Sequence, residues 1–144
     1  MLKFILIVAF LFLPHVGFAK SDGLLERNHY WGKVTSVYDG DSITAAIALW
    51  PGQTVNAKIR LRGIDAPELR GKCDFEIRKA KKARDYLIER LLGSNVRITK
   101  IAVEKYGRIL ATVWSDGGHD IAKSLYENEL AVLYNGGKRR NWCQ

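Results

Sequence analysis

The stretch KIRLRGIDAPE, residues 58–68, begins as a β-strand and ends in two carboxylates. Apolar residues alternate with Arg60 and Arg62, which is the period of a half-buried strand, and Asp65 and Glu68 follow directly. Carboxylate oxygens are ligands for hard cations such as Ca²⁺, and the planar fork of arginine matches the oxygens of a phosphate group. The end of one strand therefore combines residue types suited to a metal ion and to a phosphate.

Three further segments carry polar side chains of the same kinds: YDGDS (38–42), EKYGR (104–108) and GGKRRNWC (136–143). Each segment is weak by itself, because a DG turn is common and KYGR also fits a plain hairpin turn with Gly107 at positive φ. The order and spacing of all four segments together are much more specific.

The N-terminal residues predict a secretory signal peptide. Residues 3–19 hold one positive charge, an apolar run and small residues at Gly17 and Ala19, which favours cleavage after Ala19. An uncleaved membrane anchor is the alternative, but the apolar run is short for a span of roughly 20 residues. We therefore expect a signal peptide over 1–19 and an exported protein, periplasmic or extracellular, without stable membrane association after cleavage.

The length of 144 residues favours a single domain over 20–144, with a core at about 31–135 and a basic tail at 136–144. Cleavage removes Lys3 and no acid, so 22 basic and 15 acidic residues remain, a net charge of +7. This charge suits a polyanionic partner such as nucleic acid, although solubility alone also explains it.

The chain has two cysteines, Cys73 and Cys143, both after the predicted cleavage point. An even pair in an exported protein predicts one disulfide; two unpaired thiols are the alternative. Two thiols are too few for a cysteine zinc site, and the three histidines are scattered. Trp142, beside Cys143, offers an apolar anchor for the charged tail.

Periodicity predicts two strands in 31–50 around a turn at Asp39-Gly40, a third strand over 55–63, and two more in 95–116 joined near Gly107. The spacing of apolar residues in 74–93 predicts an amphipathic helix, with Asp74 as N-cap and Gly93 as its stop.

Asp120 is expected to cap a shorter helix over 121–131, and Trp31, Trp50 and Trp114 are expected in the core. Three strands, a helix, two strands and a second helix predict an α+β, mainly β fold. We expect a five-stranded OB-fold barrel with a helix after strand 3 and a shorter helix after strand 5.

With these segments in this order, the chain from about Lys33 to Tyr134 resembles the staphylococcal nuclease-like (thermonuclease) family of secreted, calcium-dependent nucleases. The ending LYNGGKRRNWC is similar to that of a bacterial subgroup of the family. The resemblance implies that Asp41 and Asp65 are calcium carboxylates and that Ala66 offers its backbone carbonyl.

The resemblance also implies that Arg60 and Arg108 clamp phosphate and that Glu68 is the catalytic glutamate. Lys105 and Tyr106 are expected to touch phosphate. Tyr134 is either a base-stacking residue or a packing residue after the second helix. Two departures from the best-known member are Ala66 and Ser42, each in place of a threonine.

The expected function is Ca²⁺-dependent hydrolysis of DNA and RNA by a monomer, largely without sequence preference and with 3′-phosphate products. A barrel that binds nucleic acid or protein without cutting is the alternative. The expected polar site is complete, which favours the enzyme. Because neighbouring carboxylates repel each other, Asp65→Asn is expected to weaken Ca²⁺ binding and to raise stability without Ca²⁺.

Overall fold

The structure is a computed structural model that describes residues 29–104 and 107–143. The predicted signal peptide, the lead-in to residue 28, Lys105 and Tyr106 lie outside the described residues. Within the described ranges, none of the helices combines the length and the apolar character needed to cross a bilayer.

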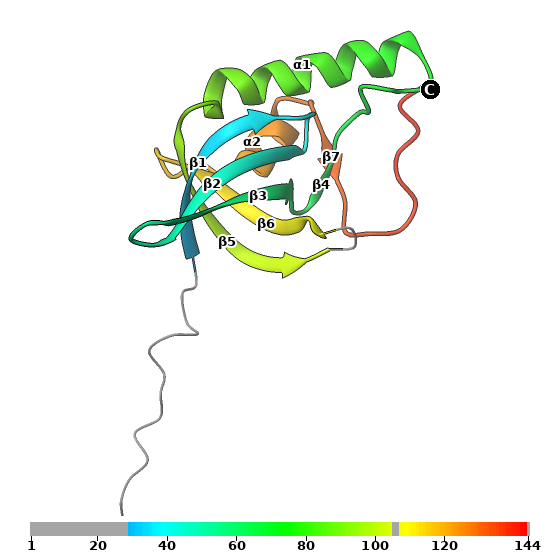
Figure 1. The fold of residues 1–144 in the computed structure, drawn as a ribbon. Helices are drawn as coiled ribbons and strands as arrows, with labels where there is room; N and C mark the ends of the chain where they lie inside the picture. Colours follow the sequence, from blue (N-terminus) through cyan, green and yellow to red (C-terminus); the bar gives the residue numbers. More distant parts are fainter. Residues whose placement is uncertain (1–28, 105–106, 144) are drawn as a thin grey trace, which may run out of the picture.

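Five strands close into a barrel, as the sequence predicts (Figure 1). The order around the barrel is β1-β2-β3-β6-β5, and every pairing is antiparallel except that of β3 with β6. Pairing of β1 with β5 completes the closure and leaves no free edge, which is how small barrels protect their strands. The strands are β1 (His29–Val37), β2 (Ser42–Trp50), β3 (Gln53–Leu61), β5 (Asn95–Val103) and β6 (Ile109–Ser115).

Alternate residues of each strand fill the barrel, so the period of two decides which side chains face outward. Gly32 and Val34 are buried on β1, which turns Trp31 outward with half of its surface exposed. Trp50, at the end of β2, is 65% exposed, and Trp114 is only partly buried. The prediction that the three tryptophans form the core was therefore wrong, because they occupy the outward positions or the end of a strand. The apolar side chains that the strands bury in the barrel are Val34, Ile43, Ala45, Ile47, Ala57, Ile59, Leu61, Val96, Ile98, Ala111 and Val113.

Helix α1 (Asp74–Leu91) lies across one end of the barrel (Figure 1). Its core-facing side includes Leu87 and Leu91, both fully buried, and each contributes about 1.5–3 kcal/mol by burial. The N-cap is Cys73 and not the predicted Asp74. The helix ends at Leu91 with Leu92 as its C-cap. Gly93, the predicted stop, follows the cap, adopts φ +79° and donates its N–H to the carbonyl of Val34 on β1.

Helix α2 (Ile121–Glu127) is capped by Asp120, which accepts the N–H of Lys123 at 3.1 Å. It ends earlier than predicted, and Glu129 in the left-handed region (φ +57°) turns the chain away. The chain then pairs β7 (Val132–Leu133) with β4 (Ile64–Asp65), a two-residue ribbon that the sequence did not predict. From β7 the tail returns to the N-terminal end of α1 (Figure 1).

Candidate active site

Strand β3 directs Arg60 to the outside of the barrel because its neighbours Ile59 and Leu61 face the interior. Arg60 pairs in register with Ser42 of β2, so it lies next to the residue that precedes this strand, Asp41. The Nη1 atom of Arg60 is 2.6 Å from Oδ1 of Asp41. The sheet register thus brings together an arginine and a carboxylate 19 residues apart.

The β1–β2 turn packs tightly against the rest of the site at Gly40. A Cβ atom there would lie 2.7 Å from the Cβ of Ala83 on α1 and 2.8 Å from the Cβ of Ala66. This close approach requires glycine and fixes the position of Asp41, which is only 3% exposed. The Asp41 carboxylate also accepts hydrogen bonds from the backbone N–H of Ala66 and the hydroxyl of Ser42, both at 3.1 Å.

Gly63 turns the chain at the end of β3 with φ +86°, and β4 then places Asp65 in the interior with no exposed surface. Its Oδ1 lies 3.6 Å from Nη2 of Arg60. Its Oδ2 is buried and has no hydrogen-bond partner in the part of the chain that the structure describes. A buried carboxylate oxygen without a partner is costly unless a cation or a donor satisfies it.

Glu68 is held by a second acid that sequence reasoning missed. Buried Glu76, in the first turn of α1, accepts the backbone N–H of Glu68 at 3.3 Å and that of Lys72 at 2.9 Å. Gly71 lies against this side chain, where a Cβ would be 2.5 Å from Cγ of Glu76. Glu76 therefore fixes the loop that presents Glu68. Its place in the first helical turn was the available signal.

The two arginines expected to bind phosphate share a carboxylate. Arg108 Nη2 lies 3.1 Å from Oε2 of Glu104, and Arg60 Nε lies 4.0 Å from the other oxygen of the same residue. Glu104 thus links the two guanidinium groups, a role that sequence reasoning did not assign. The local sequence offers one indication of this contact, which is that Glu104 lies four residues before Arg108.

A third arginine, Arg139 of the tail, enters the site. Its Nε donates to Oδ1 of Asp65 at 2.5 Å, its Nη2 to the carbonyl of Ala66 at 3.4 Å, and its Nη1 to Glu68. Burial alone would lower the pKa of Arg139, but its hydrogen bonds to Asp65 and Glu68 dominate and raise that pKa above its ordinary value. The sequence shows a basic tail, but it does not single out this residue as part of the site.

The oxygen atoms in this cluster suit a hard cation. Asp41, Asp65 and Glu68 supply carboxylates and Ala66 a carbonyl, the kinds of ligand that Ca²⁺ prefers. The guanidinium of Arg139 already contacts three of these groups, so the surroundings favour positive charge. The residues present therefore fit the expected cation.

A second group of possible metal ligands is excluded by its chemistry. Among the described His, Cys, Asp and Glu side chains, those of Cys73, Glu76 and Cys143 form the only group of three whose ligand atoms all lie within 4.8 Å of one another. The sulfurs of both cysteines are joined in a disulfide, so neither is available as a thiolate. The predicted disulfide is confirmed, with the two Cα atoms 5.9 Å apart.

Asp39 adds another acid beside Asp41. Burial, together with repulsion from Asp41, raises the pKa of Asp39 to about 6. One of its oxygens accepts the backbone N–H of Asp41 at 3.1 Å. The site thus holds several acids in direct contact with arginines.

Tyr134 lies near the arginine side of the site. Its hydroxyl donates to the carbonyl of Gly137 at 2.8 Å, and its backbone N–H bonds to Gly63 at 2.9 Å. With Arg60 and Glu104 it lines a pocket of about 450 Å³. The structure therefore gives Tyr134 a role in holding the tail and also a position beside Arg60. The predicted phosphate contacts Lys105 and Tyr106 lie outside the described residues.

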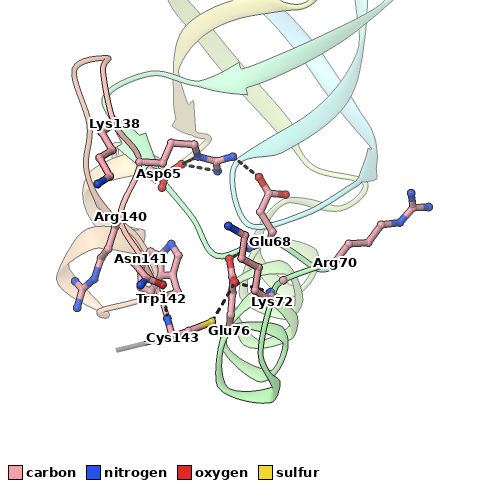
Figure 2. A pocket seen from close by; sticks show the side chains of 12 residues that line it. Asp65, Glu68, Arg70, Lys72, Glu76, Lys138, Arg140, Asn141, Trp142 and Cys143 are labelled. Atoms are coloured by element: carbon pink, nitrogen blue, oxygen red, sulfur yellow. Dashed lines mark hydrogen bonds and ion pairs between the residues drawn. The ribbon is translucent and has the colours of Figure 1, made fainter.

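The tail and the loop before α1 form the two walls of a cleft of about 600 Å³ at the acidic end of the site. Figure 2 shows Glu68 and Lys72 on one side of it and Lys138 and Arg140 on the other. Trp142 is 4% exposed, which confirms it as the tail's apolar anchor. The cleft is thus lined by both acids and cations.

Comparison with known proteins matches residues 58–142 to the family described as staphylococcal nuclease homologue. A thermonuclease of Staphylococcus hyicus is 32% identical over 130 residues, which cover 88% of this chain and 70% of that protein. A probable endonuclease LCL3 of Yarrowia lipolytica is 32% identical over 127 residues, covering 74% and 56%, respectively. One of Komagataella phaffii is 27% identical over 135 residues, covering 77% and 58%.

This chain spans about half the length of the LCL3 relatives that it matches. The family match covers more than half of the chain and includes Arg60, Asp65, Glu68 and Arg108. The Staphylococcus hyicus protein is covered over more than two thirds of its length. The chain belongs to the staphylococcal nuclease homologue family.

Proposed function

We propose that this protein is an exported, Ca²⁺-dependent nuclease that hydrolyses phosphodiester bonds of DNA and RNA, largely without sequence preference, and leaves 3′-phosphate ends. The observation that supports this proposal most strongly is that four polar side chains come together at one end of the barrel: Asp41, Arg60, Asp65 and Glu68. A cluster of buried acids and arginines is costly for a structural role alone, which favours a function for it.

A Ca²⁺ ion held by Asp41, Asp65 and the carbonyl of Ala66 would supply Lewis-acid stabilisation of the charge that develops on the phosphoryl oxygens. The protein's own side chains supply the rest of the catalytic machinery. Arg60 and Arg108 each present a fork of donors that stays charged at any working pH, and Glu104 keeps both forks on the same side of the site. These arginines bind the phosphate and stabilise its transition state.

Glu68 accepts a proton from the attacking water, or orients that water, on the side of the phosphate opposite the departing oxygen. The water oxygen bonds to phosphorus and the bond from phosphorus to O5′ breaks. The departing 5′ oxygen takes up a proton from solvent and leaves as a hydroxyl group, and the proton that Glu68 accepted is returned to solvent. Glu76 holds the backbone of Glu68, so this carboxylate is presented from a fixed loop. The basic cleft and the exposed cations around it attract the strand without reading its bases.

Digestion of single-stranded DNA, duplex DNA and RNA tests this proposal, with Ca²⁺ and then with excess chelator. Cleavage that stops with chelator supports the enzyme. Glu68→Gln should then lower turnover, while Glu89→Gln, on the exposed face of α1, should not. Retention of nucleic acid without cleavage in any condition would support the non-catalytic binding module instead. A polymerase that extends the product ends only after phosphatase treatment would identify 3′-phosphates.

Two further expectations accompany the activity. Export with removal of residues 1–19 is tested by N-terminal sequencing of protein from the periplasm and the medium. The expected monomer is tested by size-exclusion chromatography with light scattering, which gives the molar mass in solution. A mature chain that begins upstream of Lys20, or that stays with the membrane fraction, would contradict the signal-peptide assignment.

A further inference from the structure

Arg139 contacts three of the groups that the proposed function assigns to metal binding and catalysis. Its guanidinium bonds to Asp65, to the carbonyl of Ala66 and to Glu68, from a tail more than 70 residues away in sequence. We propose that Arg139 is an internal counter-ion that occupies the cation position of the metal-free protein, so that Ca²⁺ binds only in exchange for it. This inference rests on the proposed Ca²⁺ site.

Charge balance explains why a guanidinium is held there. Asp65 has no exposed surface and Asp41 is 3% exposed, and buried carboxylates without counter-charges are strongly destabilising. Arg60 forms its short ion pair with Asp41, and the short contact of Asp65 is with Arg139. The arriving cation would take over the same charge compensation, so the two positive groups compete for the same oxygens.

The tail is held from both sides, which keeps Arg139 at high effective concentration. On one side β7 is hydrogen-bonded to β4, and Tyr134 bonds to Gly137. On the other side, the disulfide of Cys143 fixes the chain end to the start of α1. Gly136 and Gly137 adopt φ +99° and +91°, which lets the chain bend between these two anchors.

The neighbours of Arg139 are directed elsewhere. Arg140 lies over the ring of Trp142 with 4.9 Å between its guanidinium carbon and the ring centre, and Lys138 lines the cleft of Figure 2. The Arg139 side chain is 42% exposed and borders a cleft of about 600 Å³. It therefore has room to leave the carboxylates while its backbone stays tethered.

Calorimetric titration of the mature protein with CaCl₂ tests the exchange. Arg139→Gln should bind Ca²⁺ about tenfold or more tightly than the wild type, because the cation no longer displaces charge-assisted hydrogen bonds. The matched control is Arg140→Gln, which removes the same charge from the adjacent tail position but no contact with Asp65 or Glu68. Its dissociation constant should stay within about threefold of the wild type, since an exposed charge acts only through a screened field.

Thermal unfolding in excess chelator supplies a second readout that is independent of activity. Without metal, Arg139→Gln should have a lower midpoint than both the wild type and Arg140→Gln, since it leaves Asp65 with less counter-charge. Addition of CaCl₂ should then raise the midpoint of Arg139→Gln more than that of the wild type.

The outcomes separate this inference from the proposed function. Equal or weaker Ca²⁺ binding by Arg139→Gln, while the wild type still shows chelator-sensitive cleavage, would overturn the exchange and leave the nuclease standing. Absence of Ca²⁺ binding and of cleavage in the wild type would overturn both. Equal tightening in Arg140→Gln would also overturn the exchange, because net charge and not the contact would then be the cause.

Discussion

The Nη1 atom of Arg60 lies 2.6 Å from Oδ1 of Asp41, so an arginine expected to bind phosphate is engaged with a carboxylate expected to bind metal. Its Nη2 atom is 3.6 Å from Asp65, the second such carboxylate. Arg60 therefore supplies counter-charge to both buried acids.

Arg60→Ala should reduce turnover by at least about 100-fold, the scale expected from loss of one preorganised transition-state donor. Arg62→Ala is the matched control from the same strand end. The guanidinium of Arg62 bonds to the carbonyls of Lys100 and Leu110, at 2.7 Å and 3.3 Å, and so supports the irregular part of β5. Its loss should lower stability but leave the turnover of folded protein near wild type. Equal loss of turnover in both variants would contradict the division between these arginines.

Arg108→Ala should also lower turnover by at least about 100-fold, with the fold intact because the side chain is 40% exposed. Lys123→Ala provides the control, since Lys123 and Glu127 form another exposed pair four residues apart, on α2. Steady-state cleavage of a fluorescent oligonucleotide, with circular dichroism of both variants, is the measurement. Near wild-type turnover in folded Arg108→Ala would remove this residue from the site.

Asp65→Asn should weaken Ca²⁺ binding and activity together, because Asp65 supplies one of the two buried carboxylates of the proposed site. Calorimetric titration with CaCl₂ measures the first effect. Asp85→Asn, on the exposed side of α1, is the control. Unchanged affinity in Asp65→Asn would exclude Asp65 as a ligand.

The expected rise in stability without Ca²⁺ is revised by the structure. That expectation treated Asp41 and Asp65 as unpaired neighbours, whereas each forms a short ion pair with an arginine. Asp65→Asn leaves Arg139 and Arg60 short of a counter-charge and should lower metal-free stability by about 1–3 kcal/mol. Urea unfolding in chelator checks the sign, and a higher midpoint in the variant would restore the repulsion argument.

The barrel and the helices could be predicted because burial repeats with the period of each element. Ile59 and Leu61 alternate with Arg60, and Leu87 and Leu91 recur on one face of α1. The β4–β7 ribbon could not be predicted, since two residues are too few to show a period. The prediction for the tryptophans was wrong because it relied on their apolar character and not on the alternation of inward and outward positions along each strand.

Some residues of the site could be predicted from the sequence and others could not. Asp41, Arg60, Asp65 and Glu68 could be predicted from the family resemblance, and the structure brings them together. Glu76, Glu104 and Arg139 were not identified because their roles depend on partners far along the chain. Arg139, for example, is 74 residues from Asp65, and only closure of the tail brings them into contact.

Asp39→Asn should stabilise the metal-free protein at neutral pH. Burial and repulsion from Asp41 raise the pKa of Asp39 from 3.8 to about 6. The folded state therefore binds this proton more tightly than the unfolded chain, so the contribution of Asp39 to stability falls as pH rises through that interval and is least favourable above it.

Urea unfolding in chelator at pH 4, 5, 6 and 7.5 measures the effect. The advantage of Asp39→Asn over the wild type should be largest at pH 7.5 and shrink toward pH 4. Asparagine keeps an oxygen for the N–H of Asp41, so the turn should survive. Asp116→Asn, at an exposed position, should show no such trend. A constant difference at every pH would contradict a raised pKa as the cause.

The Cys73–Cys143 disulfide should stabilise the fold by up to about 4 kcal/mol, the chain-entropy value for a loop of this size; the two cysteines are 70 residues apart. The bond joins the N-cap of α1 to the tail that carries Arg139 and the buried Trp142.

Alanine is the suitable replacement at both cysteines, because serine at the N-cap would add a cap of its own and partly offset the loss. Urea unfolding of the double variant Cys73→Ala/Cys143→Ala should match that of wild-type protein under reducing conditions, with both midpoints below that of the oxidised wild type. Mass spectrometry of non-reduced peptides from exported protein verifies the pairing, and free thiols at both positions or coincident midpoints would refute the stabilising role.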